Sequence, residues 1–156
     1  MTVNSSEEAA LLNFLLELYQ EKIPFNRVLG ISISSLSFER AMITFKMKSE
    51  FVGNFMQNTL HGGVISAVLD ATGGLIASAG LIQKRKDLSG GEIMKLFAMV
   101  GTIDLRVDYL RPGRGNHFLS TATIMRTGKK VAVTRMELEN DRHLLIAVGT
   151  GTYLVG

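Results

Sequence analysis

The sequence predicts an α+β fold in which an antiparallel β-sheet is wrapped around a central buried α-helix, with an additional helix near the N-terminus. Three observations support this fold class. The segment GGVISAVLDATGGLIASAG is apolar on nearly every face, residues 102–109 alternate in polarity with a period of two, and residues 11–19 carry apolar side chains at helical spacing. An antiparallel sheet that wraps around one helix buries both elements.

The N-terminal helix is predicted over residues 5–22. Ser5 stands three residues before Glu8, which is the signature of a capping box, and the apolar residues that follow have helical spacing. Pro24 ends this helix, because proline lacks the backbone N–H that a helix interior needs. Residues 30–36 and 41–47 then alternate in polarity around a turn-like segment at 37–40, which predicts a hairpin of two strands.

The enclosed helix is predicted over residues 63–80. After it, QKRKDLSGGE is the only loop-like insertion of any length, with Gly90 and Gly91 as helix breakers. We therefore expect an exposed loop between the central helix and the C-terminal strands.

Four strands are predicted in the C-terminal part. In the first, Ile103, Leu105, Val107 and Tyr109 alternate with polar residues, so one face should be core and the other solvent-exposed. The other three are expected over residues 118–125, 131–138 and 144–154. Because neither a linker nor an internal repeat is visible, residues 1–156 are expected to form a single domain.

Composition excludes several classes of function. The chain has no cysteine, so disulfide scaffolds, thiolate zinc sites and cysteine nucleophiles are excluded, and no set of His and carboxylates has metal-ligand spacing. A net charge of +3 suits a small anionic ligand better than a nucleic acid. Acidic residues stand where a secretory signal carries Lys or Arg, and Asp70 interrupts the longest apolar run. We expect a cytoplasmic protein with no metal, nucleic-acid or membrane partner.

Asp70 is the residue that most needs an explanation. It lies in the most apolar helix, where burying an unpaired carboxylate costs several kcal/mol unless a partner or a function compensates. One face of that helix carries small and polar side chains at Ser66, Asp70, Gly73, Gly74 and Ala77. An isolated buried Asp is more often a hydrogen-bonded structural residue, so a catalytic role needs further support.

The segment His61-Gly62-Gly63 opens the same helix and supplies that support. Unpaired N–H groups and the positive end of the helix dipole suit a carbonyl oxygen that gains negative charge. Glycines let a substrate approach the backbone, although a glycine pair also occurs in tight turns and His61 also fits a helix cap. The combination with Asp70 is what indicates chemistry.

The segment LHGGVISAVLD resembles the pattern of HGG followed by Asp or Glu, nine residues after the His, in hotdog-fold acyl-CoA thioesterases of the 4-hydroxybenzoyl-CoA and phenylacetyl-CoA thioesterase-like superfamily. The resemblance extends to IDLRVDYLRPG, RTGKKVAV and the closing AVGTGTYLV. It implies a hotdog fold and hydrolysis of an acyl-CoA to the free acid and CoA. No cofactor is implied beyond the coenzyme A that the substrate carries.

By this resemblance, the backbone N–H of Gly62 or Gly63 polarises the thioester carbonyl, and Asp70 either attacks it or activates a water. Two alternatives stay open. One is a non-catalytic acyl-CoA sensor on the same fold. The other is a hotdog dehydratase or hydratase, in which His61 and Asp70 would form the catalytic pair.

A polar residue before the HGG motif is also implied. The family often has Asn or Gln six residues before the His, but here that position is Phe55. Asn54 is the nearest candidate to orient the water or the carbonyl, with Gln57 and Asn58 as alternatives.

Substrate-binding residues are predicted on both sides of the motif. Phe51, Phe55 and Met56 precede it and are apolar, so they fit an acyl pocket as well as ordinary core packing. Binding of the coenzyme A phosphates needs cationic side chains. Four basic residues are candidates, and each equally fits a solvated position on the surface. The candidates are Arg111, Arg126, Lys129 and Lys130.

Gly62 and Asp70 cannot act together on one thioester within a single chain, because eight residues of helix hold them about 12 Å apart. Two antiparallel copies of the helix, related by a two-fold axis, would bring Gly62 of one chain towards Asp70 of the other. We expect a homodimer as the minimum active unit, and a homotetramer built from two dimers is also open. The acyl group itself is not predicted.

Overall fold

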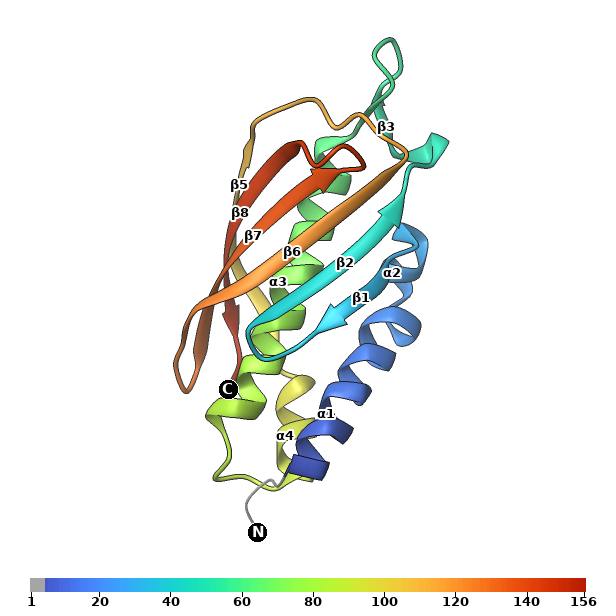
Figure 1. Ribbon diagram of the computed structural model, residues 1–156. Helices are drawn as coiled ribbons and strands as arrows, with labels where there is room; N and C mark the ends of the chain where they lie inside the picture. Colours follow the sequence, from blue (N-terminus) through green and yellow to red (C-terminus); the bar gives the residue numbers. More distant parts are fainter. Residues whose placement is uncertain (1–4) are drawn as a thin grey trace.

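The structure, a computed structural model, describes residues 5–156 and confirms the sheet wrapped around a buried helix (Figure 1). Six antiparallel strands form one sheet in the order β1-β2-β6-β7-β8-β5, which curves around helix α3, Gly62–Lys84. These strands are β1 Ser32–Leu36, β2 Arg40–Lys46, β5 Gly101–Tyr109, β6 His117–Thr127, β7 Val131–Asn140 and β8 Leu145–Leu154. A small second sheet pairs β3, Val52–Asn54, with β4, Thr59–Leu60, after a 3-10 turn at Ser49–Phe51. All the predicted strands are therefore present, and β3 and β4 are additional.

The first helix covers the predicted residues 5–22, as α1, Ser5–Glu17, continued by a π-helical turn, Leu18–Lys22. Ser5 is the first described residue and is already helical, so the predicted cap lies at the boundary of the described chain. Pro24 ends this helix as predicted but also begins a short helix that was not predicted, α2, Pro24–Leu29. Proline fits the first turn of a helix because its missing N–H would have no partner there.

Helix α3 forms the core of the fold. It extends the predicted residues 63–80 by one residue at its start and continues to Lys84 at its end. The inner face of the sheet packs on it with fully buried side chains such as Ile43, Ala122 and Met136. An 18-residue stretch of α3 is apolar enough to cross a membrane, but 78% of that stretch is buried inside the protein, as in a core helix.

The segment predicted as a loop is partly helical, and that prediction is wrong in its second half. Gly90 and Gly91 begin a further helix, α4, Gly90–Phe97, instead of breaking the chain. The Ser89 hydroxyl accepts the N–H of Glu92 at 3.4 Å, and the Glu92 carboxylate accepts the N–H of Ser89 at 2.9 Å. The Ser89 hydroxyl also donates to the Glu92 carboxylate at 2.7 Å, and this hydrogen bond, together with the one from the Ser89 N–H, lowers the pKa of Glu92. This capping box stabilises the helix end despite the two glycines.

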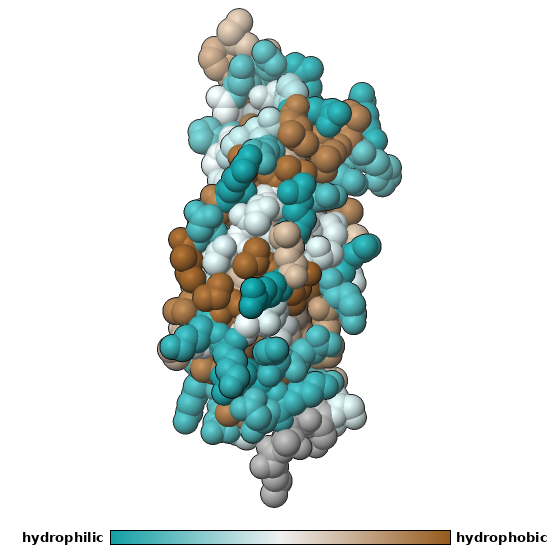
Figure 2. All heavy atoms as spheres, turned by 90° about the vertical axis from the view of Figure 1, so that its left-hand side faces the viewer, coloured by the Kyte–Doolittle hydropathy of each residue, from teal (hydrophilic) through white to brown (hydrophobic). Residues whose placement is uncertain are grey.

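Strand β5 lies at one edge of the sheet, next to β8. The alternation predicted for it is present, and its apolar face is core in part: Leu105 and Val107 are half-buried and pack against the core, whereas Ile103 is 58% exposed and Tyr109 54%. Figure 2 views the side of the molecule on which β5 lies, where hydrophobic residues appear among hydrophilic ones. An edge strand leaves a row of backbone N–H and C=O groups without partners, so this edge can accept another strand.

Candidate active site

Asp70 lies in the middle of α3 and is half-buried, with two hydroxyl donors on one carboxylate oxygen. Thr102 Oγ1 donates to Asp70 Oδ1 at 2.9 Å, and Tyr153 Oη donates to the same oxygen at 3.2 Å and to the backbone O of Asp70 at 3.1 Å. Asp70 Oδ2 accepts no hydrogen bond from the residues that the structure describes. The carboxylate is thus oriented through one oxygen and left free at the other.

Tyr153 comes from the inner face of β8, and glycines make room for it. A Cβ at Gly73 would collide with Tyr153 Oη, and one at Gly151 would stand 2.6 Å from it, so only glycine fits beside this hydroxyl without displacement. Burial, together with the negative charge of Asp70, raises the pKa of Tyr153 far above its usual range. The phenol therefore stays protonated and donates to Asp70 across the physiological pH range.

Asp70 lines a cavity of about 310 Å³ between α3, the end of the first helix and the start of β5. The buried side chain of Asn26 also lines this cavity, and its Nδ2 donates to the backbone O of Tyr19 at 2.9 Å. Sequence reasoning did not find Asn26, Thr102 or Tyr153. Each is a single polar residue far from Asp70 in the chain, and only the folded topology brings them together.

The N-terminus of α3 forms the second part of the candidate site. His61 caps the helix through Nδ1, which accepts the N–H of Gly63 at 2.8 Å. The N–H of Gly62 has no acceptor among residues 5–156. Tyr109 Oη donates to the backbone O of Gly62 at 3.1 Å and holds it beside a cavity of about 360 Å³ that also contains Arg111. Of the two predicted donors, Gly62 is the one left free to meet a carbonyl oxygen.

The predicted residues before the HGG motif lie on the β3–β4 hairpin, which projects from the end of the fold (Figure 1), except Phe51, which ends the 3-10 turn before β3. Asn54 Oδ1 accepts the N–H groups of Met56 and Gln57 at 3.1 and 3.2 Å, which closes the tip of the hairpin. Phe55 and Met56 are 87% and 84% exposed at this tip, whereas Phe51 is buried. Within one chain these side chains do not gather at Asp70, and their predicted roles in the acyl pocket and in orienting water stay predictions.

The predicted cations fall into two groups at opposite ends of the sheet. Arg126, Lys129 and Lys130 belong to the β6–β7 hairpin, where Val131 pairs with Leu154, and Leu154 with Gly101 at the start of β5. Arg111 follows the other end of β5, and its Nη1 donates to the backbone O of Leu145 at 2.9 Å. The two groups do not meet within one chain.

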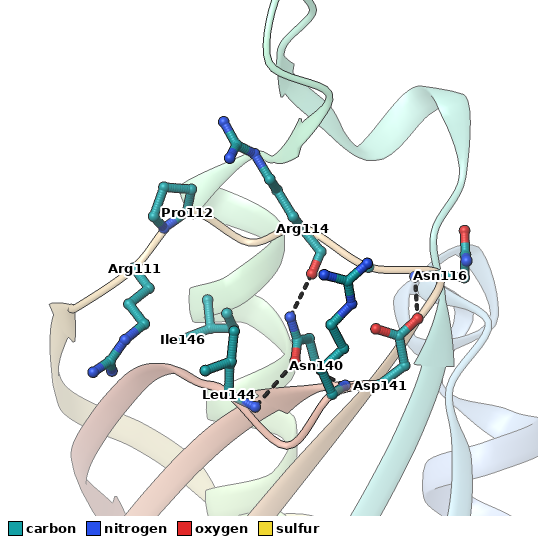
Figure 3. A pocket seen from close by; sticks show the side chains of 10 residues that line it. Arg111, Pro112, Arg114, Asn116, Asn140, Asp141, Leu144 and Ile146 are labelled. Atoms are coloured by element: carbon teal, nitrogen blue, oxygen red, sulfur yellow. Dashed lines mark hydrogen bonds between the residues drawn. The ribbon is translucent and has the colours of Figure 1, made fainter.

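Arg111 also borders a larger cavity of about 530 Å³, which is shown in Figure 3. Two further arginines line it, Arg114 and Arg142, which sequence reasoning missed because they stand in loops without a recognisable motif. The buried amide of Asn140 joins two segments that line this cavity. Its Nδ2 donates to the backbone O of Arg114 at 2.7 Å, and its Oδ1 accepts the N–H of Leu144 at 3.0 Å. The described residues contain no cluster of His, Asp and Glu that could hold a metal ion.

The fold and the arrangement at α3 define the class of protein, a hotdog-fold thioester hydrolase. The family model of the Thioesterase superfamily matches residues 57–147, which include the HGG segment, Asp70 and β5. The chain belongs to this superfamily, as the sequence resemblance implied.

Individual relatives agree with this membership over nearly the whole chain. The chain is 43% identical over 154 residues to the medium/long-chain acyl-CoA thioesterase YigI of Escherichia coli strain K12, which covers 99% of this chain and 98% of YigI. A crystal structure of a Shewanella oneidensis protein related to the thioesterase superfamily superposes with a TM-score of 0.93 at 44% identity, over 99% of this chain and 100% of that one. The PaaI protein of Escherichia coli shares the fold, with a TM-score of 0.74 at 20% identity over 97% and 95% of the two chains.

Proposed function

We propose that this protein hydrolyses medium- and long-chain acyl-CoA thioesters, with Asp70 as the catalytic carboxylate. The observation that carries the proposal is the state of Asp70, which is held through Oδ1 by Thr102 and Tyr153 while Oδ2 is unpaired among the described residues, next to a cavity. The 43% identity to YigI, a medium/long-chain acyl-CoA thioesterase, supports the choice of substrate.

The proposed site is shared between two chains. Gly62 contacts Tyr109 at the end of β5, and Asp70 contacts Thr102 near its start. If β5 pairs antiparallel with β5 of a second chain, the Tyr109 end of one strand lies beside the Thr102 end of the other. Gly62 of one chain then approaches Asp70 of its partner, and the exposed apolar residues of β5 become buried. We propose a homodimer with two equivalent sites.

In this site the chemistry divides between the two chains. The N–H of Gly62, at the positive end of α3, stabilises the oxygen of the thioester carbonyl as it gains negative charge. Asp70 of the other chain either attacks the carbonyl carbon or takes a proton from the water that attacks it. In the first route an Asp70–acyl anhydride forms as the C–S bond breaks, and water then hydrolyses this anhydride; in the second, water forms the C–O bond directly. In both routes CoA leaves as the thiolate and takes up a proton, so the products are the free acid and CoA.

The same pairing of chains explains the two groups of cations. Because it places the two ends of β5 side by side, Arg111 of one chain comes to the same end of the dimer as Arg126, Lys129 and Lys130 of the other. Guanidinium and ammonium groups from both chains are then available to the phosphates of one coenzyme A.

Thiol release from a panel of acyl-CoAs, measured with a thiol-reactive chromogen, tests the proposed function. The chain has no cysteine, so the protein itself gives no signal. We expect Asp70→Asn to lower kcat/KM about 100-fold or more, while Glu39→Gln, an exposed control on the turn between β1 and β2, stays near wild type. No release by wild type from any acyl-CoA, or equal activity of Asp70→Asn and wild type, would contradict the proposal.

A further inference from the structure

A second cavity adjoins the one that Asp70 lines. It measures about 300 Å³ and lies between the first helix, α3 and α4, and it shares Tyr19, Ile23 and Val100 with the Asp70 cavity. Its other lining residues are Phe14, Leu18, Ser78, Met94, Phe97 and Ala98. The volumes of both cavities lie at the lower end of the range for small-molecule sites, which begins at roughly 300 Å³.

The lining of the second cavity selects for an uncharged, apolar ligand. None of its nine lining residues carries a charge, and its polar side chains are Tyr19 and Ser78, whose hydroxyls lie 3.4 Å apart. Ser78 Oγ also donates to the backbone O of Gly74 at 2.9 Å. Burial raises the pKa of Tyr19 to about 12, so its phenol stays neutral. At the far end the rings of Phe14 and Phe97 stack with their centres 6.1 Å apart.

One face of α3 connects the carboxylate to this cavity. Asp70, Gly74 and Ser78 follow one another at intervals of four residues, so they lie in line along the helix over about 12 Å. Gly74 makes room for Tyr19, because a Cβ there would stand 3.0 Å from Tyr19 Oη, so the Tyr19 side chain lies against this face between the two cavities. A short acyl group such as butyryl, bound at Asp70, would not reach the second cavity, whereas a long one would.

We propose that the acyl chain of the substrate runs from Asp70 past Tyr19 into the cavity between the first helix and α4, where Met94 and Phe97 set the accepted chain length. This inference rests on the proposed function and assigns its acyl-binding site. It gives a role to α4, the helix that closes the cavity. It also places the chain in a different part of the protomer from Phe51, Phe55 and Met56.

Substitution of Met94 tests the inference, because this side chain is 44% exposed at the rim of the cavity and a larger one can fill it without disturbing the core. We expect Met94→Trp to lower kcat/KM at least 10-fold for dodecanoyl- and palmitoyl-CoA and less than 2-fold for butyryl-CoA. Met99→Trp is the matched control, since Met99 follows α4 at 53% exposure and lines neither cavity. Phe97→Leu, which enlarges the far end, is expected to raise activity on palmitoyl-CoA relative to octanoyl-CoA.

Equal chain-length profiles for Met94→Trp, Met99→Trp and wild type would overturn the inference, as would a uniform loss at every chain length. Inactivity of wild type on all acyl-CoAs would instead contradict the proposed function. Binding of non-hydrolysable thioether analogues of butyryl- and dodecanoyl-CoA by calorimetry gives the same comparison without turnover. Weaker binding of the dodecanoyl analogue alone to Met94→Trp supports the proposed path of the acyl chain. Affinities of Met94→Trp equal to those of wild type for both analogues overturn it.

Discussion

At the scale of single residues, the molecule accommodates a carboxylate on its most apolar helix by giving it two hydroxyl donors. Asp70, Thr102 and Tyr153 come from α3 and from the paired strands β5 and β8. The sequence pointed to Asp70 because a charged residue in an apolar helix is conspicuous. It could not point to the two hydroxyls, because Thr and Tyr are ordinary strand residues and only the register of β5 on β8 places them together.

Removal of the Tyr153 hydroxyl is expected to slow catalysis with little effect on substrate binding. Tyr153→Phe keeps the ring in its place and deletes one hydrogen bond to the carboxylate, a loss of about 1.5–3 kcal/mol or roughly 10- to 100-fold in kcat. Thr102→Val removes the other donor and should act in the same direction. Steady-state kinetics separate kcat from KM. An unchanged kcat in both variants would mean that the hydroxyls do not position Asp70.

At the scale of elements, the predictions succeeded where a pattern was long and regular. The helix over 63–80, the first helix and the six strands of the large sheet all follow from periodicity. The short elements α2, α4, β3 and β4 were missed because turn chemistry and capping decide them. At Ser89 the capping box competes with Gly90 and Gly91, and the tertiary packing of Ile93 and Phe97 in the core favours the helix.

At the scale of elements, the exposed face of β5 also leads to a prediction about the pairing of two chains. Ile103→Lys places a charge on the edge that we propose pairs with a second chain, so the proposed dimer should dissociate and activity should fall with it. Size-exclusion chromatography with light scattering should then report a mass near the 17.1 kDa of one chain. Met125→Lys is the control, because Met125 is 62% exposed on β6, away from the edge. An unchanged mass for Ile103→Lys would exclude β5 from the interface.

At the scale of the whole molecule, one chain contains both halves of the proposed site but holds them apart. The free N–H of Gly62 and the carboxylate of Asp70 lie at opposite ends of β5, and so do the two groups of cations. The sequence indicated this separation through the eight residues of helix between Gly62 and Asp70. The edge strand that would unite the halves became evident only from the sheet order.

The most direct test of the proposed shared site combines two chains that are each expected to be inactive. Gly62→Pro removes the N–H at a helix position that tolerates proline, and Gly62→Ala keeps the N–H as its control. Gly62→Pro and Asp70→Asn, co-expressed with different tags and purified as a heterodimer, leave one intact site of two. Each homodimer should be nearly inactive, and the heterodimer should recover about half of wild-type acyl-CoA hydrolysis. A heterodimer no more active than the two homodimers would contradict a site shared between Gly62 of one chain and Asp70 of the other.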